Sequence, residues 1–153
     1  MLYGLNERDT EYPASITKVM TAMLAIEAVD RGELSLNDVI TVGSEVNREV
    51  GDGSSTQNIK EGEQIRLEDV LYCALTASAN EACNVLAEAV SGSVTEFVAR
   101  MNARAAELGM THTRFVNACG LDAEGHYSSA RDVAAMSLAL LRHPKILEYS
   151  GIW

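Results

Sequence analysis

The strongest constraint on the fold is a run of apolar residues with helical spacing between Pro13 and Gly32. The apolar side chains recur every three or four positions, the period of one helix face, at Ile16, Val19, Met20, Met23, Leu24 and Ala28. Proline is favoured in the first turn of a helix, and glycine is favoured just past its end. We therefore predict a helix over residues 14–31, in a chain whose 153 residues suffice for one domain with a real core.

Helical signals also occur in four later segments, residues 66–77, 80–92, 93–109 and 129–143. Ser93, followed by Glu96, has the pattern of a capping box, and Pro144 stops the last helix. Residues 35–65 mix short β-branched runs with "GDGSS", which indicates loops and short extended pieces. Residues 2–12 favour the remnant of a hairpin. The chain is therefore predicted to be mostly α.

The formal net charge of −10 limits the classes of partner. Nucleic acids and anionic membranes attract clustered Lys and Arg, so this charge argues against both as the main partner. Charges interrupt every apolar stretch before it reaches the roughly 18 residues that a membrane-spanning helix needs. The opening "MLYGLNERDTEY" has neither the basic head nor the apolar middle of a secretion signal.

The cysteines and histidines give no metal-binding pattern. An odd number of cysteines without C-x-x-C spacing fits neither a disulfide framework nor a zinc site. Cys73 and Cys83 lie in apolar helical patterns, which favours small buried thiols, whereas Cys119 lies beside Gly120 in a loop. The three histidines are scattered and lack ligand spacing: His112, His126 and His143. We expect no metal and no cofactor.

Ser15 and Lys18 form an S-x-x-K pattern where the first helix begins. Residues three apart share a helix face, so the hydroxyl and the amine can come within hydrogen-bonding distance. A serine hydroxyl needs a neighbouring base, and a lysine amine can serve when small apolar neighbours favour its neutral form. The helix N-terminus also stabilises developing negative charge. The alternative is a chance pattern, with Ser15 as a plain helix residue and Lys18 as an exposed charge.

Three stretches together carry a family resemblance: "PASITKVMTAMLAIE", "VLYCALTASANEACNVLAEAVSGS" and "FVARMNARAAELGMTHTRFVNACGLDAEGHYSSARDVA". In that order and at those distances, they resemble the D-alanyl-D-alanine carboxypeptidases, low-molecular-mass penicillin-binding proteins that trim peptidoglycan stem peptides. The resemblance covers nearly the whole chain. It implies the helical lobe of the α/β fold shared by penicillin-binding proteins and β-lactamases, with residues 1–153 as a single truncated catalytic domain. It also implies a bacterial, extracytoplasmic protein of the cell envelope.

The resemblance implies a role for four residues. Ser15 is the expected nucleophile and Lys18 its base, matching the S-x-x-K element. Ser78 and Asn80 match the family's S-x-N element, in which the serine relays a proton and the asparagine binds lysine and substrate. A hydroxyl both donates and accepts, and an amide does both without titrating, so these roles are chemically sound. Asn80 could also cap the third helix, and both roles can hold together.

His126 and Asp132 could suggest a Ser-His-Asp triad, with histidine's convenient pKa range as the only support. The family does not use such a triad. Ser128 or Ser129 fits a helix cap instead. We therefore expect "GHYSSARD" to be structural.

The family's third element, K-T-G on a sheet strand, does not occur in the sequence, whose lysines are Lys18, Lys60 and Lys145. In relatives this strand supplies a positive charge for the substrate carboxylate and one of the two oxyanion-hole N–H groups. Losing one oxyanion donor typically costs about 10²- to 10³-fold in rate. We expect the polypeptide alone to hydrolyse little or nothing, and the apolar face meant for the sheet to favour self-association.

The resemblance implies an acyl-enzyme mechanism in which Ser15 attacks the penultimate D-Ala carbonyl of a stem peptide ending in D-Ala-D-Ala. Terminal D-Ala then leaves, water deacylates the serine, and β-lactams acylate the same residue. Two alternatives stay open. A β-lactamase-like hydrolase shares the S-x-x-K logic, and the chain as it stands could be a non-catalytic helical module or truncated product.

Overall fold

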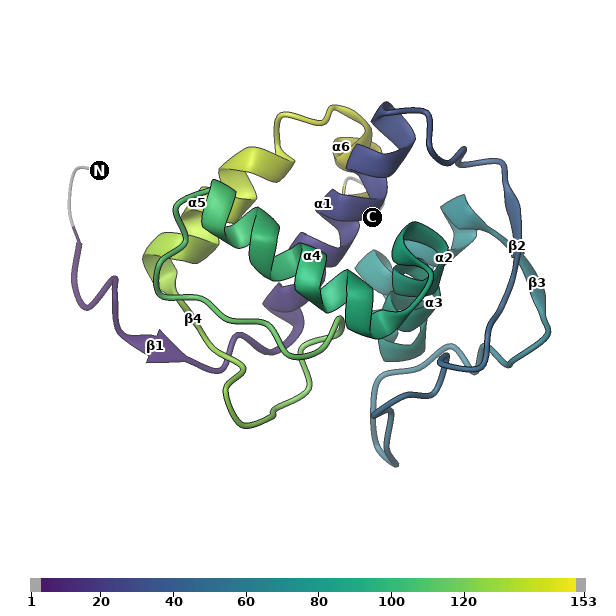
Figure 1. The fold of residues 1–153 in the computed structure, drawn as a ribbon, viewed down its shortest axis with the longest axis horizontal. Coiled ribbons are helices and arrows are strands. Elements are labelled where there is room, and N and C mark those ends of the chain that lie inside the picture. Colours follow the sequence, from purple (N-terminus) through teal and green to yellow (C-terminus); the bar gives the residue numbers. More distant parts are fainter. Residues whose placement is uncertain (1–3, 151–153) are drawn as a thin grey trace.

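The computed structural model describes residues 4–150 and is predominantly helical (Figure 1). Its helices are η1 (Ala14–Ile16, a 3₁₀ turn), α1 (Thr17–Asp30), α2 (Leu67–Thr76), α3 (Asn80–Ser91), α4 (Val94–Glu107), α5 (Ala130–Leu140) and α6 (Lys145–Ser150). Its strands are β1 (Thr10–Glu11), β2 (Val39–Thr41), β3 (Gln64–Arg66) and β4 (Ser128–Ser129). The mostly α prediction is confirmed.

Helix α1 is the centre of the helical assembly (Figure 1). It contacts α2, α3, α4 and α5, and 10 of its 14 residues are buried. A helix that is apolar on nearly all faces belongs in the interior of a protein. The small residues Ala22 and Ala25 are buried as completely as Met20 and Met23, so the predicted apolar face extends around most of the helix.

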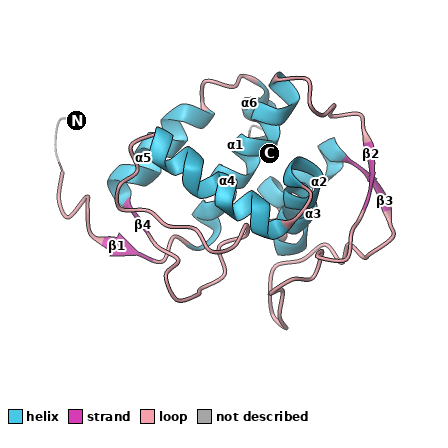
Figure 2. Ribbon diagram, viewed as in Figure 1, coloured by secondary structure: helices cyan, strands magenta, loops and turns pink. Residues whose placement is uncertain are grey.

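The two small sheets lie at opposite ends of the molecule in Figure 2. Strands β2 and β3 pair antiparallel with Ile40 opposite Ile65, as expected for short extended pieces within residues 35–65. Strand β1 pairs with β4, so that Thr10 lies opposite Ser129. The predicted hairpin within residues 2–12 is therefore wrong for the part the structure describes, because the strand finds its partner far along the chain; residues 2 and 3 lie outside the described residues.

The helices begin and end near the residues predicted from the sequence, with two corrections. Ser93 caps α4 by accepting a hydrogen bond from the Glu96 backbone N–H at 3.1 Å, and Ser129 caps α5 in the same way. Helix α5 ends at Leu140 rather than at residue 143. The chain then turns at Pro144 into α6, which was not predicted, and Tyr149 of α6 is fully buried.

Candidate active site

Ser15 lies in η1, directly before α1. The preceding residue Ala14 has a left-handed backbone with φ 46°, a conformation that is uncommon outside glycine. This turn leaves Ser15 exposed. Its Oγ lies 3.1 Å from Lys18 Nζ and 2.9 Å from Ser78 Oγ. The structure therefore brings Ser15 into direct contact with two of the other predicted site residues.

The Lys18 amine is buried, with 5% of the residue exposed, so it is not an exposed first-turn charge. It donates to Ser15 Oγ, to Asn80 Oδ1 at 2.8 Å and to the Cys119 carbonyl oxygen at 2.7 Å. A buried amine is stable only where its N–H groups find acceptors, and an ammonium has three to place. These acceptors come from η1, α3 and the loop before β4, so the amine is fixed from three sides.

Ser78 lies in the short turn between α2 and α3. Its backbone is left-handed, with φ 56°. Non-glycine residues in this region cost of order 1–3 kcal/mol and cluster at functional sites.

The expected capping role of Asn80 is wrong: Ala79 is the N-cap of α3 and makes no side-chain cap bond, while the Asn80 side chain accepts from Lys18.

An open cavity of about 620 Å³ lies over Ser15 and Asn80. Ser15 and Asn80 line it together with Cys119 and Gly120. Its other wall comes from the segment around residues 49–55. The cavity is large enough for a short peptide segment or a drug-sized ligand. It places the exposed hydroxyl of Ser15 where a ligand can reach it.

The loop of residues 116–126 supports the nucleophile turn from behind. The Ala118 carbonyl accepts a hydrogen bond from Thr21 Oγ1 at 2.6 Å, one turn below Lys18. Gly120 has φ 92°, and a Cβ at this position would overlap the backbone carbonyl of Ala14. Only glycine therefore allows this approach, which sets the position of the residue before Ser15.

His126 is a buried structural residue. Its Nδ1 accepts from the Val116 backbone N–H at 3.1 Å, which leaves Nε2–H to donate to Thr17 Oγ1 at 2.8 Å. Burial lowers the pKa of His126 below its ordinary value, so the neutral ring is favoured. Asp132 accepts from the His112 backbone N–H and from Thr113 instead. Within the described residues these contacts form no Ser-His-Asp chain.

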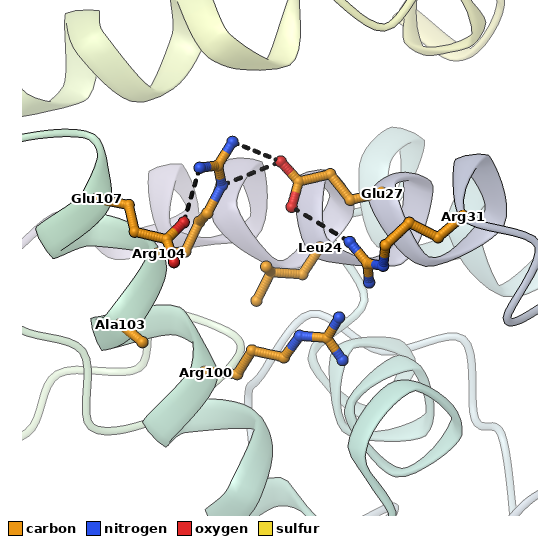
Figure 3. A pocket seen from close by; sticks show the side chains of 7 residues that line it. All are labelled: Leu24, Glu27, Arg31, Arg100, Ala103, Arg104 and Glu107. Carbon is orange, nitrogen blue, oxygen red and sulfur yellow. Dashed lines mark hydrogen bonds and ion pairs between the residues drawn. The ribbon is translucent and has the colours of Figure 1, made fainter.

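A second cavity, between α1 and α4, is lined by paired charges (Figure 3). Glu27 accepts two hydrogen bonds from Arg104, at 2.8 and 3.0 Å, and Arg104 also donates to Glu107. Arg31 pairs with Glu33 at 2.6 Å. Because these guanidinium groups already hold carboxylates, this cavity joins two helices and carries no chemistry comparable to that at Ser15.

The cysteines and histidines of residues 4–150 form no cluster that could hold a metal ion. Cys83 is fully buried, as expected, and burial raises the pKa of its thiol. Cys73 is only half-buried, and Cys119 is buried. In the same part of the chain, no helix has both the length and the apolar character needed to cross a membrane.

Sequence reasoning missed several residues that build this site. The Cys119 backbone carbonyl cannot be identified from its side chain, and the contact between Thr17 and His126 joins residues that are far apart in the chain. The sequence shows that Gly120 lies in a loop, but it does not show that this glycine packs against the backbone of Ala14.

Comparisons with known proteins identify the family of the chain. The D-alanyl-D-alanine carboxypeptidase family matches residues 1–152. The chain is 38% identical over 153 residues to D-alanyl-D-alanine carboxypeptidase DacF of Bacillus subtilis, covering 100% of this chain and 39% of that protein. It is 38% identical over 132 residues to carboxypeptidase DacC of Escherichia coli, covering 84% of this chain and 33% of that protein.

Solved structures show the same fold. Penicillin-binding protein 6B of Escherichia coli superposes with a TM-score of 0.90 and 34% identity, over 97% of this chain and 48% of that one. Penicillin-binding protein D2 of Listeria monocytogenes, in its cefotaxime-bound form, gives 0.82 and 32%, over 97% of this chain and 60% of that one. The chain thus spans less than half the length of the curated relatives named above, and it belongs to the D-alanyl-D-alanine carboxypeptidase family.

Proposed function

We propose that this chain carries the acylating half of a serine-type D-Ala-D-Ala carboxypeptidase site. The observation that carries the proposal is the position of Ser15 Oγ between Lys18 Nζ and Ser78 Oγ, with Lys18 held by Asn80. The four residues come from η1, α1, the α2–α3 turn and α3, as a site assembled for one reaction would require. The family membership supplies the reaction class.

In this mechanism, neutral Lys18 removes the proton from the Ser15 hydroxyl as Oγ attacks the penultimate D-Ala carbonyl carbon. A neutral amine has two N–H groups and one lone pair, so it can keep Asn80 and the Cys119 carbonyl as acceptors while it accepts the serine proton. The C–N bond to the terminal D-Ala then breaks, and the Ser78 hydroxyl gives its proton to the leaving amine and regains one from the protonated Lys18, which returns Lys18 to its neutral form. Water hydrolyses the acyl-serine, which returns Ser15 to its hydroxyl form.

Residues 1–153 form one helical catalytic lobe in this proposal, and the K-T-G element is the part of the family's site that they do not contain. The missing element would supply an oxyanion donor and a charge for the substrate carboxylate. We therefore propose slow or no turnover by these 153 residues alone, consistent with the factor of about 10²–10³ for one oxyanion donor. The protein's place is the bacterial cell envelope, where its substrate occurs.

β-Lactams are the proposed covalent inhibitors, since the similar Listeria protein has been solved with cefotaxime bound. They would form an ester with Ser15 by the same attack. A β-lactamase-like activity would show as rapid loss of this ester, whereas a carboxypeptidase holds it longer. A non-catalytic module would form no ester at all.

The test is release of D-alanine from a peptide ending in D-Ala-D-Ala, compared between these 153 residues and a longer protein that joins them to a K-T-G strand. We expect slow or undetectable release from the first, and release from the second that Ser15→Ala abolishes. Circular dichroism on every sample checks that the helices are formed. A folded longer protein without Ser15-dependent release would contradict the proposal.

We also propose that the 153 residues self-associate. A cavity of about 470 Å³ beside β1, η1 and α5 is mostly apolar, and Tyr12 and Ile16 at its edge are 58% and 44% exposed. Exposed apolar surface of this kind favours association. Light scattering across a tenfold concentration range should show the mass rising, and replacing Ile16 with lysine should reduce it. A constant monomer mass would contradict the idea.

A further inference from the structure

Residues 49–58 are called the rim loop here, and the part of this loop between residues 49 and 55 forms one wall of the cavity over Ser15. The loop contains no helix or strand. Three of its residues have left-handed backbones: Glu49 at φ 60°, Gly53 at φ 82° and Asn58 at φ 60°. Two of these are not glycine, so their conformations are unfavourable in isolation. One backbone–backbone hydrogen bond lies within the loop, from the Ser54 backbone N–H to the Gly51 carbonyl at 3.2 Å, and further contacts come from outside it.

Helix α3 supplies those contacts on both sides of the loop. On the entry side, Asn84 Nδ2 donates to the backbone carbonyls of Val46 at 3.1 Å and Arg48 at 2.9 Å. On the exit side, the Asn80 backbone N–H donates to the Ser55 carbonyl at 2.9 Å. The helix that presents Asn80 to Lys18 is therefore also the helix on which the rim loop rests.

Glu81 completes the exit side. Its Oε1 accepts the backbone N–H of Gln57 at 2.5 Å and that of Ile59 at 3.4 Å. The residue is only 1% exposed, and its Oε2 is buried without a hydrogen-bond partner among the described residues. Glutamate is rarely buried to this degree unless it is paired or hydrogen-bonded, and within residues 4–150 this one accepts only from backbone N–H groups. It lies in the first turn of α3, where the helix dipole favours negative charge.

We propose that Glu81 is a positioning residue that fixes the rim loop relative to Asn80 and so sets the shape of the cavity that receives the substrate. It acts through the Gln57 and Ile59 amides and touches neither Ser15 nor Lys18 in the described contacts. Its loss should therefore weaken binding before acylation and leave the bond-forming step nearly unchanged. This inference rests on the proposed function, because the ligand of the cavity is the acyl donor for Ser15.

The test compares Glu81→Gln with Glu88→Gln. Glutamine has nearly the size of glutamate, but it lacks the charge that strengthens the two backbone hydrogen bonds. Glu88 is a matched control on the same helix: its Oε2 is also buried without a partner in the described residues, and it packs on Gly43 away from the cavity over Ser15. We expect amide hydrogen exchange at Gln57 and Ile59 to quicken at least about tenfold in Glu81→Gln, and to stay unchanged in Glu88→Gln.

A second readout separates positioning from a purely structural role. The acylation rate of Ser15 is measured against the concentration of a penicillin, by intact mass. We expect Glu81→Gln to raise the half-saturating concentration about tenfold and to leave the limiting rate within about twofold. A fall in the limiting rate alone would place the effect on Asn80 and Lys18 and overturn the inference.

The outcomes also separate the inference from the proposed function. Unchanged exchange at both amides overturns the inference, whatever the kinetics show. Acylation of the wild type with identical kinetics in Glu81→Gln overturns the inference and leaves the proposed function intact. A folded wild type that no penicillin acylates overturns both, even where the exchange result holds.

Discussion

Replacing Gly120 with alanine should destabilise the protein because the new Cβ meets two separate obstacles. Gly120 has φ 92°, where an L-residue pays about 1–2 kcal/mol. The Cβ would also overlap the backbone carbonyl of Ala14 and lie 3.0 Å from Thr17 Oγ1. Backbone cannot rotate away as a side chain can, so forced displacement adds about 1–3 kcal/mol. The expected loss in the free energy of unfolding is roughly 2–5 kcal/mol.

Gly109→Ala is the matched control. Gly109 also has a left-handed backbone, with φ 72°, but nothing lies within 4 Å of the position that an added Cβ would take. It should lose only the backbone part, about 1–2 kcal/mol. Urea unfolding of the two variants gives the difference directly, and each kcal/mol should appear as about 2–4 °C in the melting temperature. A Gly120→Ala loss no larger than that of Gly109→Ala would refute the claim that this loop is pressed against the nucleophile turn.

Three further predictions concern the stability of the helical assembly. Glu27→Gln should lower the free energy of unfolding, measured with urea, by about 1–3 kcal/mol, because the Glu27 side chain is largely buried and pairs with Arg104. A loss below about 0.5 kcal/mol, as is typical of exposed ion pairs, would contradict this prediction. Burial lowers the pKa of His126, so the unfolded chain binds this proton more readily and stability falls as the pH drops below about 6.5. His126→Asn should therefore lose less stability than the wild type between pH 7 and pH 5, and equal slopes would count against the buried neutral ring. Ser129→Ala should lower the free energy of unfolding by about 1 kcal/mol through loss of the α5 cap, and an unchanged unfolding midpoint would show that the cap is dispensable.

Local patterns predicted much of the fold. Helical spacing identified α1 to α5. Ser93 was an expected cap, and either Ser128 or Ser129 was expected to cap α5, because capping depends on neighbours within one turn; the structure selects Ser129. Pairing between distant segments was not predictable in this way. Strand β1 joins β4 across most of the chain, and no turn signal near residues 2–12 specifies that partner. Helix α6 is short and owes its place to burial of Tyr149, which its six residues do not reveal.

The same distinction between contacts within one turn and contacts between distant segments applies to the candidate site. The spacing of Ser15 and Lys18 predicted their contact because both lie within one helical turn. Asn80 was expected partly as a cap, but tertiary packing directs its side chain to Lys18 instead. Cys119 contributes its backbone carbonyl, a group that every residue has, so its residue type could not identify it. The Glu81 side chain binds the backbone N–H of Gln57, and the sequence does not show which backbone group a carboxylate will meet.

The most direct test of the central claim is intact-mass spectrometry of this chain after incubation with a penicillin, beside Ser15→Ala. Circular dichroism must show that both proteins are helical. The contacts of Ser15 with Lys18 and Ser78 predict one added penicillin mass on the wild type and none on Ser15→Ala. A helical wild type that stays unmodified, or a Ser15→Ala variant that gains the same mass, would contradict the assignment of Ser15 as the nucleophile.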